Sequence, residues 1–236
     1  MVIQAAGFFG LKINVDKTKL MTSLYPPSNM NLTIQGRKIV EVQQLKYLVV
    51  ILDRKGNTKL DLIAKLNKGR MKYRSLMKIW SSNQISIPLK IRLFKILIFS
   101  SLFYGIETWK DTKQESKKMQ TFVNKCLRYI TKKFYPYNTT NYNLWSRCDT
   151  FPIYRLGEYR KIEVLGHILR QAPNNLVYQA LFITPLDESS HSWFGRLNRS
   201  LSGIGLSWDF IQRASSDRKT YKIVLRLIYE HLTNNC

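Results

Sequence analysis

The chain has 236 residues, 44% of them hydrophobic and 12% aromatic, which is enough apolar material for a folded core and excludes a disordered tail. Its 38 Lys and Arg residues against 15 Asp and Glu give a net charge of +23. This excess predicts a polyanionic partner, with nucleic acid favoured over its rival, an anionic membrane surface. Residues 1–136 hold 26 basic and 7 acidic side chains, a net charge of +19, so we expect the binding face in this part.

The first 57 residues predict a short helix and a small antiparallel sheet. The helix is expected over residues 1–6, with a stop at Gly7. Apolar and polar residues alternate over 11–15, which predicts a strand with one buried face. Two further strands are expected at 31–34 and 37–42, joined at Gln35-Gly36, and another at 45–52 before a turn.

A basic helix is predicted over residues 58–80, opened by a capping box of Thr58 and Asp61. Its expected apolar face holds Leu62, Leu66, Tyr73, Leu76, Met77 and Trp80, and its basic residues are Lys59, Lys65, Lys68, Arg70, Lys72, Arg74 and Lys78. A merely solvated helix would mix Glu with Lys to form i, i+4 pairs. The excess of positive charge therefore favours nucleic-acid binding over a solvated face.

The stretch 86–109 predicts a central buried helix, with Ser86 as its cap, Pro88 in its first turn and Gly105 at its end. Its apolar run, 96–106, is shorter than the roughly 20 residues that a membrane-spanning helix needs. A helix over 113–133 follows, with apolar residues at steps of three and four. Cys126 lies in that stripe and is expected to be a buried structural thiol.

The remaining residues predict a linker over 134–152, helices over 155–170 and 216–232, and a loop over 184–208. The fold class is therefore α+β and mostly α. The expected domains are 1–57, 58–136 and 137–236.

The cysteines and the first residues predict an intracellular protein, nuclear or cytoplasmic. Cys126, Cys148 and Cys236 are too few and too scattered for a disulfide framework. The start lacks a basic segment followed by an apolar one and a cleavage site, so we expect neither secretion nor a transmembrane segment.

A search for reactive groups predicts no catalytic centre, no metal site and no cofactor in this chain. The acidic residues are scattered, and the adjacent pair Asp187-Glu188 stands in a Ser-rich stretch. His167, His191 and His231 lack the close Cys pairing of zinc sites, and no Gly-rich phosphate loop is present.

Four segments stand in a distinctive order: G-L-K-I-N-V-D-K-T-K-L-M (10–21), L-K-Y-L-V-V-I-L-D-R-K-G-N (45–57), K-I-R-L-F-K-I-L-I-F-S-S-L-F-Y-G-I-E-T-W (90–109) and F-V-N-K-C-L-R-Y-I (122–130). Two more follow: Y-R-K-I-E-V-L-G-H-I-L-R (159–170) and G-L-S-W-D-F-I-Q-R-A-S-S-D-R (205–218). Together they resemble the back half of the reverse transcriptases of non-LTR (LINE-type) retrotransposons, over nearly the whole chain.

The resemblance implies that the sheet, about 10–56, is a remnant of the polymerase palm, that 45–52 is a primer-grip hairpin, and that 58–133 is the helical thumb. A second helical domain would form the C-terminal tail. The family's catalytic Asp residues, which hold Mg²⁺, would precede residue 1, so this chain alone is expected to be inactive. Val49 stands where the family usually has Gly, and 189–195 lacks the family's basic run.

The sequence thus predicts a truncated, reverse-transcriptase-like protein that binds RNA, RNA–DNA or DNA duplex without sequence preference, and neither membrane nor a small molecule. The candidate nucleic-acid-binding residues are Lys17, Lys19, Lys46, Tyr47, Lys65, Lys68, Arg70, Lys72 and Arg74. Two alternatives stay open. One is an interaction or scaffold protein, and the other is a fragment of an active polymerase whose Asp residues lie upstream.

Overall fold

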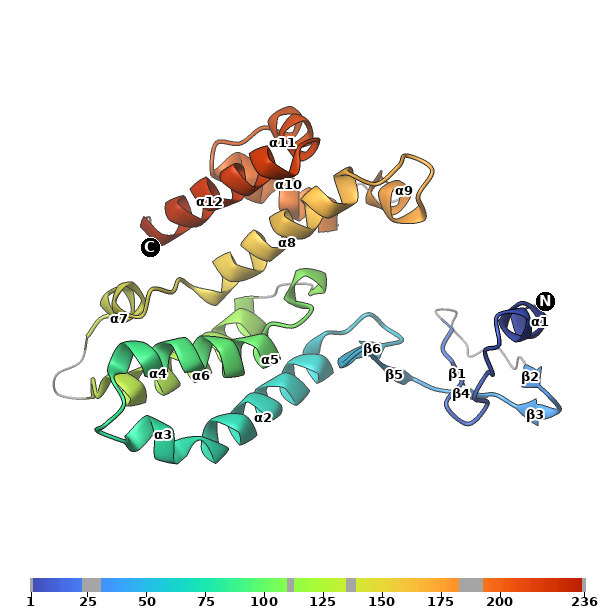
Figure 1. Ribbon diagram of the computed structural model, residues 1–236, viewed down its shortest axis with the longest axis horizontal. Coiled ribbons are helices and arrows are strands. Elements are labelled where there is room, and N and C mark those ends of the chain that lie inside the picture. Colours follow the sequence, from blue (N-terminus) through green and yellow to red (C-terminus); the bar gives the residue numbers. More distant parts are fainter. Residues whose placement is uncertain (1, 23–30, 110–112, 135–138, 183–192, 235–236) are drawn as a thin grey trace. The chain divides into compact units, whose positions relative to one another are not determined.

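The computed structural model describes residues 2–22, 31–109, 113–134, 139–182 and 193–234 (Figure 1). It is mostly helical with small two-stranded sheets, which confirms the α+β, mostly α, class. The chain divides into two compact units, residues 1–64 and 65–236, and each is described by itself. A further boundary at 136 and 137 stays a prediction.

Among its described residues, the first unit contains a short helix, three two-stranded sheets and the first turns of α2 (Lys59–Ser75). The β1–β4 pair is parallel, whereas β2–β3 and β5–β6 are antiparallel, with Thr33 opposite Lys38 and Gln44 opposite Asp53. The predicted turn at Gln35-Gly36 is confirmed, but the single antiparallel sheet is wrong. The elements are α1 (Val2–Phe8), β1 (Lys19–Leu20), β2 (Thr33–Ile34), β3 (Arg37–Lys38), β4 (Val40–Glu41), β5 (Gln44–Tyr47) and β6 (Val50–Asp53).

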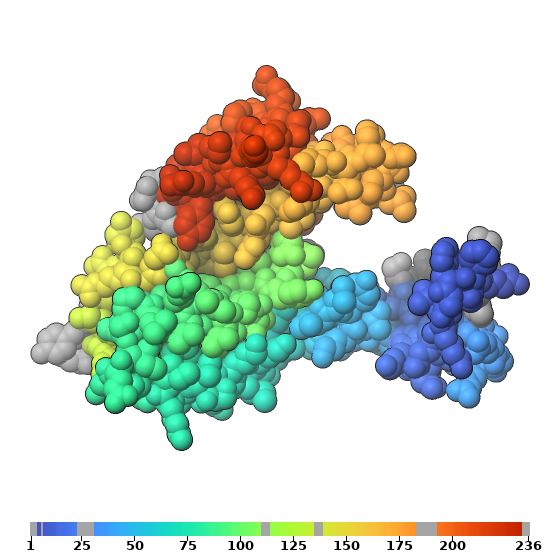
Figure 2. Space-filling view, viewed as in Figure 1, coloured from blue at the N-terminus to red at the C-terminus, as the bar shows by residue number. Residues whose placement is uncertain are grey.

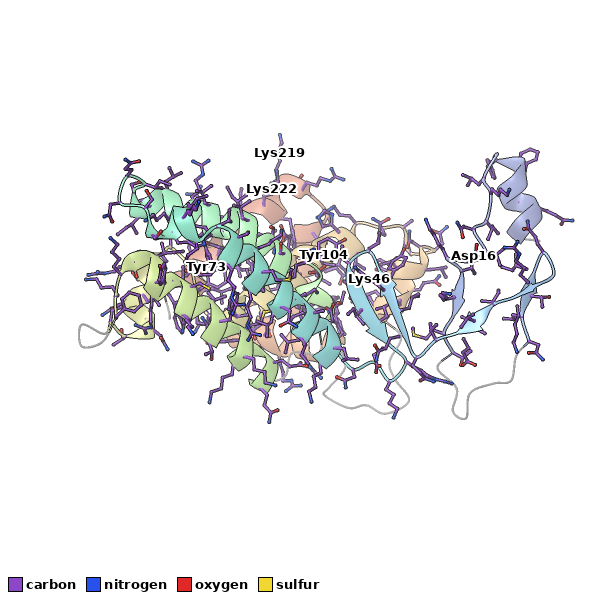
Figure 3. All side chains as sticks on the ribbon, turned by 90° about the horizontal axis from the view of Figure 1, so that it is seen from below. Asp16, Lys46, Tyr73, Tyr104, Lys219 and Lys222 are labelled. Atoms are coloured by element: carbon purple, nitrogen blue, oxygen red, sulfur yellow. The ribbon has the colours of Figure 1, made fainter. Side chains whose placement is uncertain are left out.

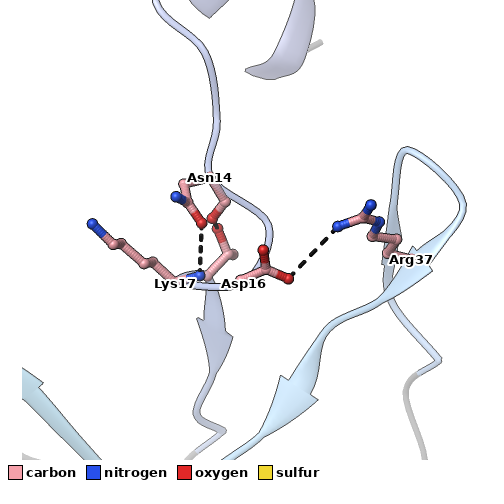
Figure 4. A network of polar contacts seen from close by, with 5 residues as sticks. Asn14, Asp16, Lys17 and Arg37 are labelled. Atoms are coloured by element: carbon pink, nitrogen blue, oxygen red, sulfur yellow. Dashed lines mark hydrogen bonds and ion pairs between the residues drawn. The ribbon is translucent and has the colours of Figure 1, made fainter.

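The predicted strand at 11–15 is wrong, because a turn occupies residues 15–17. The backbone N–H of Lys17 donates to Oδ1 of Asn14 at 3.0 Å, and that of Thr18 donates to the Asn14 carbonyl at 3.1 Å (Figure 4). An Asn side chain that bonds the local backbone competes with sheet pairing. Nearby, Asp16 forms an exposed ion pair with Arg37 at 3.7 Å.

A hairpin replaces the single strand predicted over 45–52. The chain reverses at Leu48 and Val49, whose φ angles are +44° and +79°, so that Tyr47 pairs with Val50. Positive φ at both turn positions is typical of Asn-Gly, and a β-branched residue is strained there. The sequence offers no turn residue at this point, which is why periodicity alone predicted one strand.

A small polar network connects the ends of three strands in this unit. The side chain of Arg54 is 5% exposed and lies 3.4 Å from Oε1 of Glu41. The hydroxyl of Thr22 donates to the same carboxylate at 2.8 Å and accepts from Arg54 at 3.0 Å. The charge of Arg54 is therefore both paired and hydrogen bonded, as burial requires.

Two groups of helices form the second unit. The first group comprises the part of α2 (Lys59–Ser75) from residue 65 on, α3 (Met77–Ser81), α4 (Ile87–Phe94), a π-helical turn (Lys95–Phe99), α5 (Ser100–Leu102), a 3₁₀ turn (Ile106–Thr108) and α6 (Lys113–Thr131). The helix predicted over 58–80 is broken at Leu76. The central helix ends at Leu102, three residues before the predicted stop at Gly105, which has φ +71° and precedes the 3₁₀ turn.

An aromatic cluster fills the core of this first group. The ring of Tyr73 stacks on Trp80 at 5.5 Å between centroids and meets Phe94 edge-on at 6.1 Å. The indole Nε1–H of Trp80 donates to the Tyr73 carbonyl at 2.9 Å. This buried hydrogen bond stabilises the break in the helix after α2. Cys126 is buried as predicted, and this burial raises the pKa of its thiol to about 12.

A buried lysine also holds the connection between α3 and α4. Lys90 is 2% exposed, and its Nζ donates to the carbonyls of Trp80 at 2.8 Å and Ser82 at 2.5 Å. These bonds satisfy backbone acceptors at the C-terminal end of α3, where helical partners run out. Lys90 is therefore part of the core and not of the basic surface.

The second group begins at α7 and ends at α12. The predicted linker contains α7, and α10 lies within the predicted loop 184–208, so both predictions are partly wrong; residues 183–192 lie outside the described residues. In Figures 1 and 2, α8 (gold) lies between the first group and α12 (red), and it contacts helices of both groups. The elements are α7 (Asn141–Arg147), α8 (Ile153–Leu169), α9 (Leu176–Phe182), α10 (Trp193–Gly203), α11 (Trp208–Ser215) and α12 (Arg218–Asn234).

None of the helices in the described part of the chain combines the length and the apolar character needed to cross a membrane.

Candidate nucleic-acid interface

The basic residues predicted on α2 divide between its buried and its outward faces. Lys65 is 2% exposed, so it is not part of the surface as the sequence suggested. Its Nζ donates to the Tyr104 carbonyl at 2.5 Å and lies 4.7 Å from the centroid of the Trp109 ring. Helical spacing places Lys65 on the same face as Asp61, Leu62 and Gly69, which is the face that packs.

Lys72 lies at the edge between the two faces. Its Nζ donates to the hydroxyl of Ser101 at 2.5 Å, which holds the Lys72 side chain against α5. Lys72 is nevertheless exposed, as are the three other predicted residues of this helix, Lys68, Arg70 and Arg74. Arg70 donates to Oδ1 of Asn67 at 3.2 Å, a contact that leaves its guanidinium at the surface.

In the first unit, the candidates Lys17, Lys19, Lys46 and Tyr47 are all exposed. Lys46 and Tyr47 belong to β5 beside the strained turn of the hairpin, and Lys19 belongs to β1. The structure brings Lys46 and Tyr47 together on one hairpin.

A second basic surface, absent from the predicted residues, covers the outward face of α6. Its stripe of Met119, Val123, Cys126, Leu127 and Ile130 is buried. From 117 to 132 the chain carries no acidic residue and five basic ones, four on α6 and one just after it: Lys117, Lys118, Lys125, Arg128 and Lys132. The argument used for α2, that basic residues without acidic partners favour nucleic-acid binding, applies equally to α6. It could have identified these basic residues from the sequence.

Side-chain contacts connect α2 to α6 between their basic faces. A Cβ built on Gly69 would lie 3.3 Å from the ring of Phe122, and the Tyr73 hydroxyl lies 3.4 Å from the Cys126 carbonyl. Tyr73 also meets Tyr129 edge-on at 6.5 Å between centroids. Phe122 and Tyr129 therefore mark the side of α6 that faces α2.

Helical spacing places basic residues along both sides of this contact. Lys118 and Lys125 share the side of α6 marked by Phe122. On α2, Arg70 lies one turn before Tyr73 and shares an exposed face with Arg74, four residues further on. We call these four residues the basic seam. Of these, Arg74, Lys118 and Lys125 have no ion-pair partner among the residues that the structure describes. The seam can therefore offer its charge to an external anion.

One acidic residue, Glu115, lies in the first turn of α6, before Lys118, and three acidic residues elsewhere in this unit form ion pairs. Ion pairs join Asp149 to Lys95 at 2.9 Å, Glu163 to Arg160 at 2.7 Å and Glu230 to Arg226 at 3.0 Å. Within the described ranges, His, Cys, Asp and Glu do not gather in any group of three or more that could hold a metal ion. Lys219 and Lys222 are exposed on α12, away from the seam in sequence (Figure 3).

Comparison with known proteins gives no match, whether to a family model, to a curated protein or to a solved structure.

Proposed function

We propose that this chain binds RNA, RNA–DNA hybrid or DNA duplex without sequence preference, through the basic seam and the exposed lysines beside it. The observation that carries the proposal is the outward surface of α2 and α6, which is basic and carries no acidic residue over 65–75 and 117–132. Lys and Arg side chains placed on phosphates release condensed counterions, and this favours binding at low salt. The resemblance of residues 10–21, 45–57 and 90–109 to non-LTR retrotransposon reverse transcriptases supports the same proposal.

Filter binding over a series of salt concentrations tests this function. We expect the affinity for duplex to fall steeply as salt rises. The double variant Lys118→Gln/Lys125→Gln should bind more weakly and reduce the slope of log K against log salt by about 2, because each lost phosphate contact removes about 0.9.

The matched control is Lys219→Gln/Lys222→Gln, which removes the same charge from exposed positions of another long helix. It should reduce the slope by much less. If the two double variants had equal effects, the net charge of the protein and not the basic seam would determine its affinity for nucleic acid. Absence of binding at low salt would contradict the proposal, and partners that survive nuclease treatment would favour an interaction protein instead.

A further inference from the structure

A pocket of about 620 Å³ opens beside the outward face of α6, between that helix, α7 and the start of α8. Two aromatic side chains, Trp145 and Tyr154, line it together with the amides of Gln120, Asn124 and Asn141. Lys117, one of the basic residues of α6, also lines it. The pocket therefore borders the surface that we propose to bind phosphates.

The amides in this pocket have orientations that their neighbours fix. Arg128 Nη2 donates to Oδ1 of Asn141 at 2.8 Å, and an arginine can only donate. The atom of Asn124 that contacts this same oxygen at 3.1 Å is therefore its amino nitrogen, which leaves its Oδ1 at the other side.

The opposite end of the network leads to the same assignment. The indole Nε1–H of Trp145, which also can only donate, lies 2.8 Å from Oδ1 of Asn124. Gln120 donates its Nε2 to that oxygen at 2.8 Å, and its own Oε1 accepts from the backbone N–H of Ile153 at 2.7 Å. Obligate donors at three points thus set every amide in the chain.

This arrangement leaves donors for a ligand. Oδ1 of Asn141 accepts from both Asn124 and Arg128, so both of its lone pairs are used. Its Nδ2 group, by contrast, has no hydrogen-bond partner among the described residues. A ligand that fits must present acceptors to this amide, offer a flat ring to Trp145 and Tyr154, and tolerate the cation of Lys117.

We propose that the pocket holds one unpaired nucleobase of a single-stranded nucleic acid, with an adjoining phosphate near Lys117. This inference rests on the proposed function, since the strand would reach the pocket along the basic face of α6. Bases carry carbonyl or ring-nitrogen acceptors and stack on aromatic side chains once they are unpaired. A base inside a duplex is already stacked and paired, so duplex would use the basic seam without entering the pocket.

The variant Asn141→Asp tests the proposal sharply. An Asp at this position keeps an oxygen for Asn124 and Arg128 but replaces the donor Nδ2 by an acceptor. Asn143→Asp is the matched control, because it makes the same charge change two residues along α7 at an exposed position outside the pocket. The probes are oligouridylate of about 20 nucleotides and an RNA–DNA duplex of equal length, at one salt concentration.

We expect Asn141→Asp to weaken oligouridylate binding at least about fivefold relative to Asn143→Asp, and to leave duplex binding equal in the two variants. The proposed nucleobase pocket would be rejected if the two variants affected oligouridylate binding equally, or if Asn141→Asp lost the same affinity for both probes. Either result would leave the proposed role of the basic seam unaffected. Failure of the unaltered protein to bind either probe would reject both the pocket and the proposed function.

A second pair of variants keeps the test decisive if Asn141→Asp does not fold. Tyr154, in the pocket, and Tyr142, outside it, are 45% and 47% exposed. Tyr154→Leu should weaken oligouridylate binding several-fold, whereas Tyr142→Leu should not, since base stacking on an aromatic ring would be lost in the first variant only. Equal binding by these two variants would also overturn the proposal.

Discussion

Gly166 lies where α8 meets α12, and it leaves room for a buried ring. A Cβ built on Gly166 would lie 2.1 Å from Cε1 of Tyr221, far inside van der Waals contact. That ring cannot move away easily, because it is 2% exposed and its hydroxyl donates to the Ile162 carbonyl at 2.5 Å. The glycine is therefore required by packing and not by backbone conformation.

Replacement Gly166→Ala should lower the free energy of unfolding by about 2–3 kcal/mol, because the new methyl group forces a fixed neighbour to shift. Urea unfolding measures the change. The control is Gly203→Ala in α10, where a Cβ would meet no atom within 4 Å. There we expect stabilisation of up to about 1 kcal/mol from helix propensity. Equal unfolding midpoints for the two variants would contradict the packing described for α8 and α12.

At the scale of one element, Lys90 secures α3 to α4 by bonding two carbonyls from a buried position. Lys90→Met keeps the length of the side chain but leaves both acceptors without this donor. We expect a loss of about 2–3 kcal/mol in unfolding free energy, since buried unsatisfied carbonyls keep their desolvation cost. The exposed Lys78 of α3 offers the comparison, and Lys78→Met should stay within about 0.5 kcal/mol of the unaltered protein. A neutral Lys90→Met would show that these bonds contribute nothing.

The long helices could be predicted from the sequence because their apolar periodicity is strong. The buried stripe of α6 is an example, since its apolar residues follow steps of three and four. The end of the central helix was predicted only approximately, because the helix ends at Leu102, three residues before Gly105. Periodicity did not predict the hairpin turn at Leu48 and Val49, because neither residue is a turn former, whereas the resemblance implied a hairpin over 45–52. The segment that forms α10 was predicted as loop because its Ser and Gly content outweighed its apolar spacing.

The candidate site could be predicted only in part. Composition correctly identified α2 as a helix rich in basic residues, yet tertiary packing decides which of them are exposed. Lys65 is buried and bonds Tyr104, whereas Lys72 stays exposed while bonding Ser101; both partners lie far away in sequence. The pocket beside α6 could not be derived from the sequence, since its amide network joins Gln120 to the backbone of Ile153 across three helices.

For the whole molecule, burial of weak acids makes stability depend on alkaline pH. Burial raises the pKa of Tyr73 and of Tyr221, and it raises the pKa of Cys126 to about 12 and of Cys148 to about 11. The unfolded chain releases these protons at lower pH than the native protein does. The native state then binds more protons, so the unfolding free energy must fall as pH rises.

We therefore expect stability to be constant near neutral pH and to decline above about pH 9, by at most about 1.4 kcal/mol per pH unit for each titrating group. Urea unfolding at a series of pH values measures the decline. Tyr73→Phe removes one group and should flatten the curve at little cost, because the hydroxyl contact with the Cys126 carbonyl is long at 3.4 Å. Stability that stays level up to about pH 11 would contradict the burial of these groups.

Residues 65–75 and 117–132 carry basic side chains and no acidic ones, which also has a kinetic consequence. A surface with one sign of charge attracts a polyanion over distances near the Debye length, so the seam should govern how fast a strand arrives. A nucleobase enclosed by Trp145 and Tyr154 is beyond such long-range attraction, and the pocket should govern how slowly the strand leaves. Added salt would then reduce the association rate constant of both probes, while the pocket would lengthen the residence time of the single strand alone.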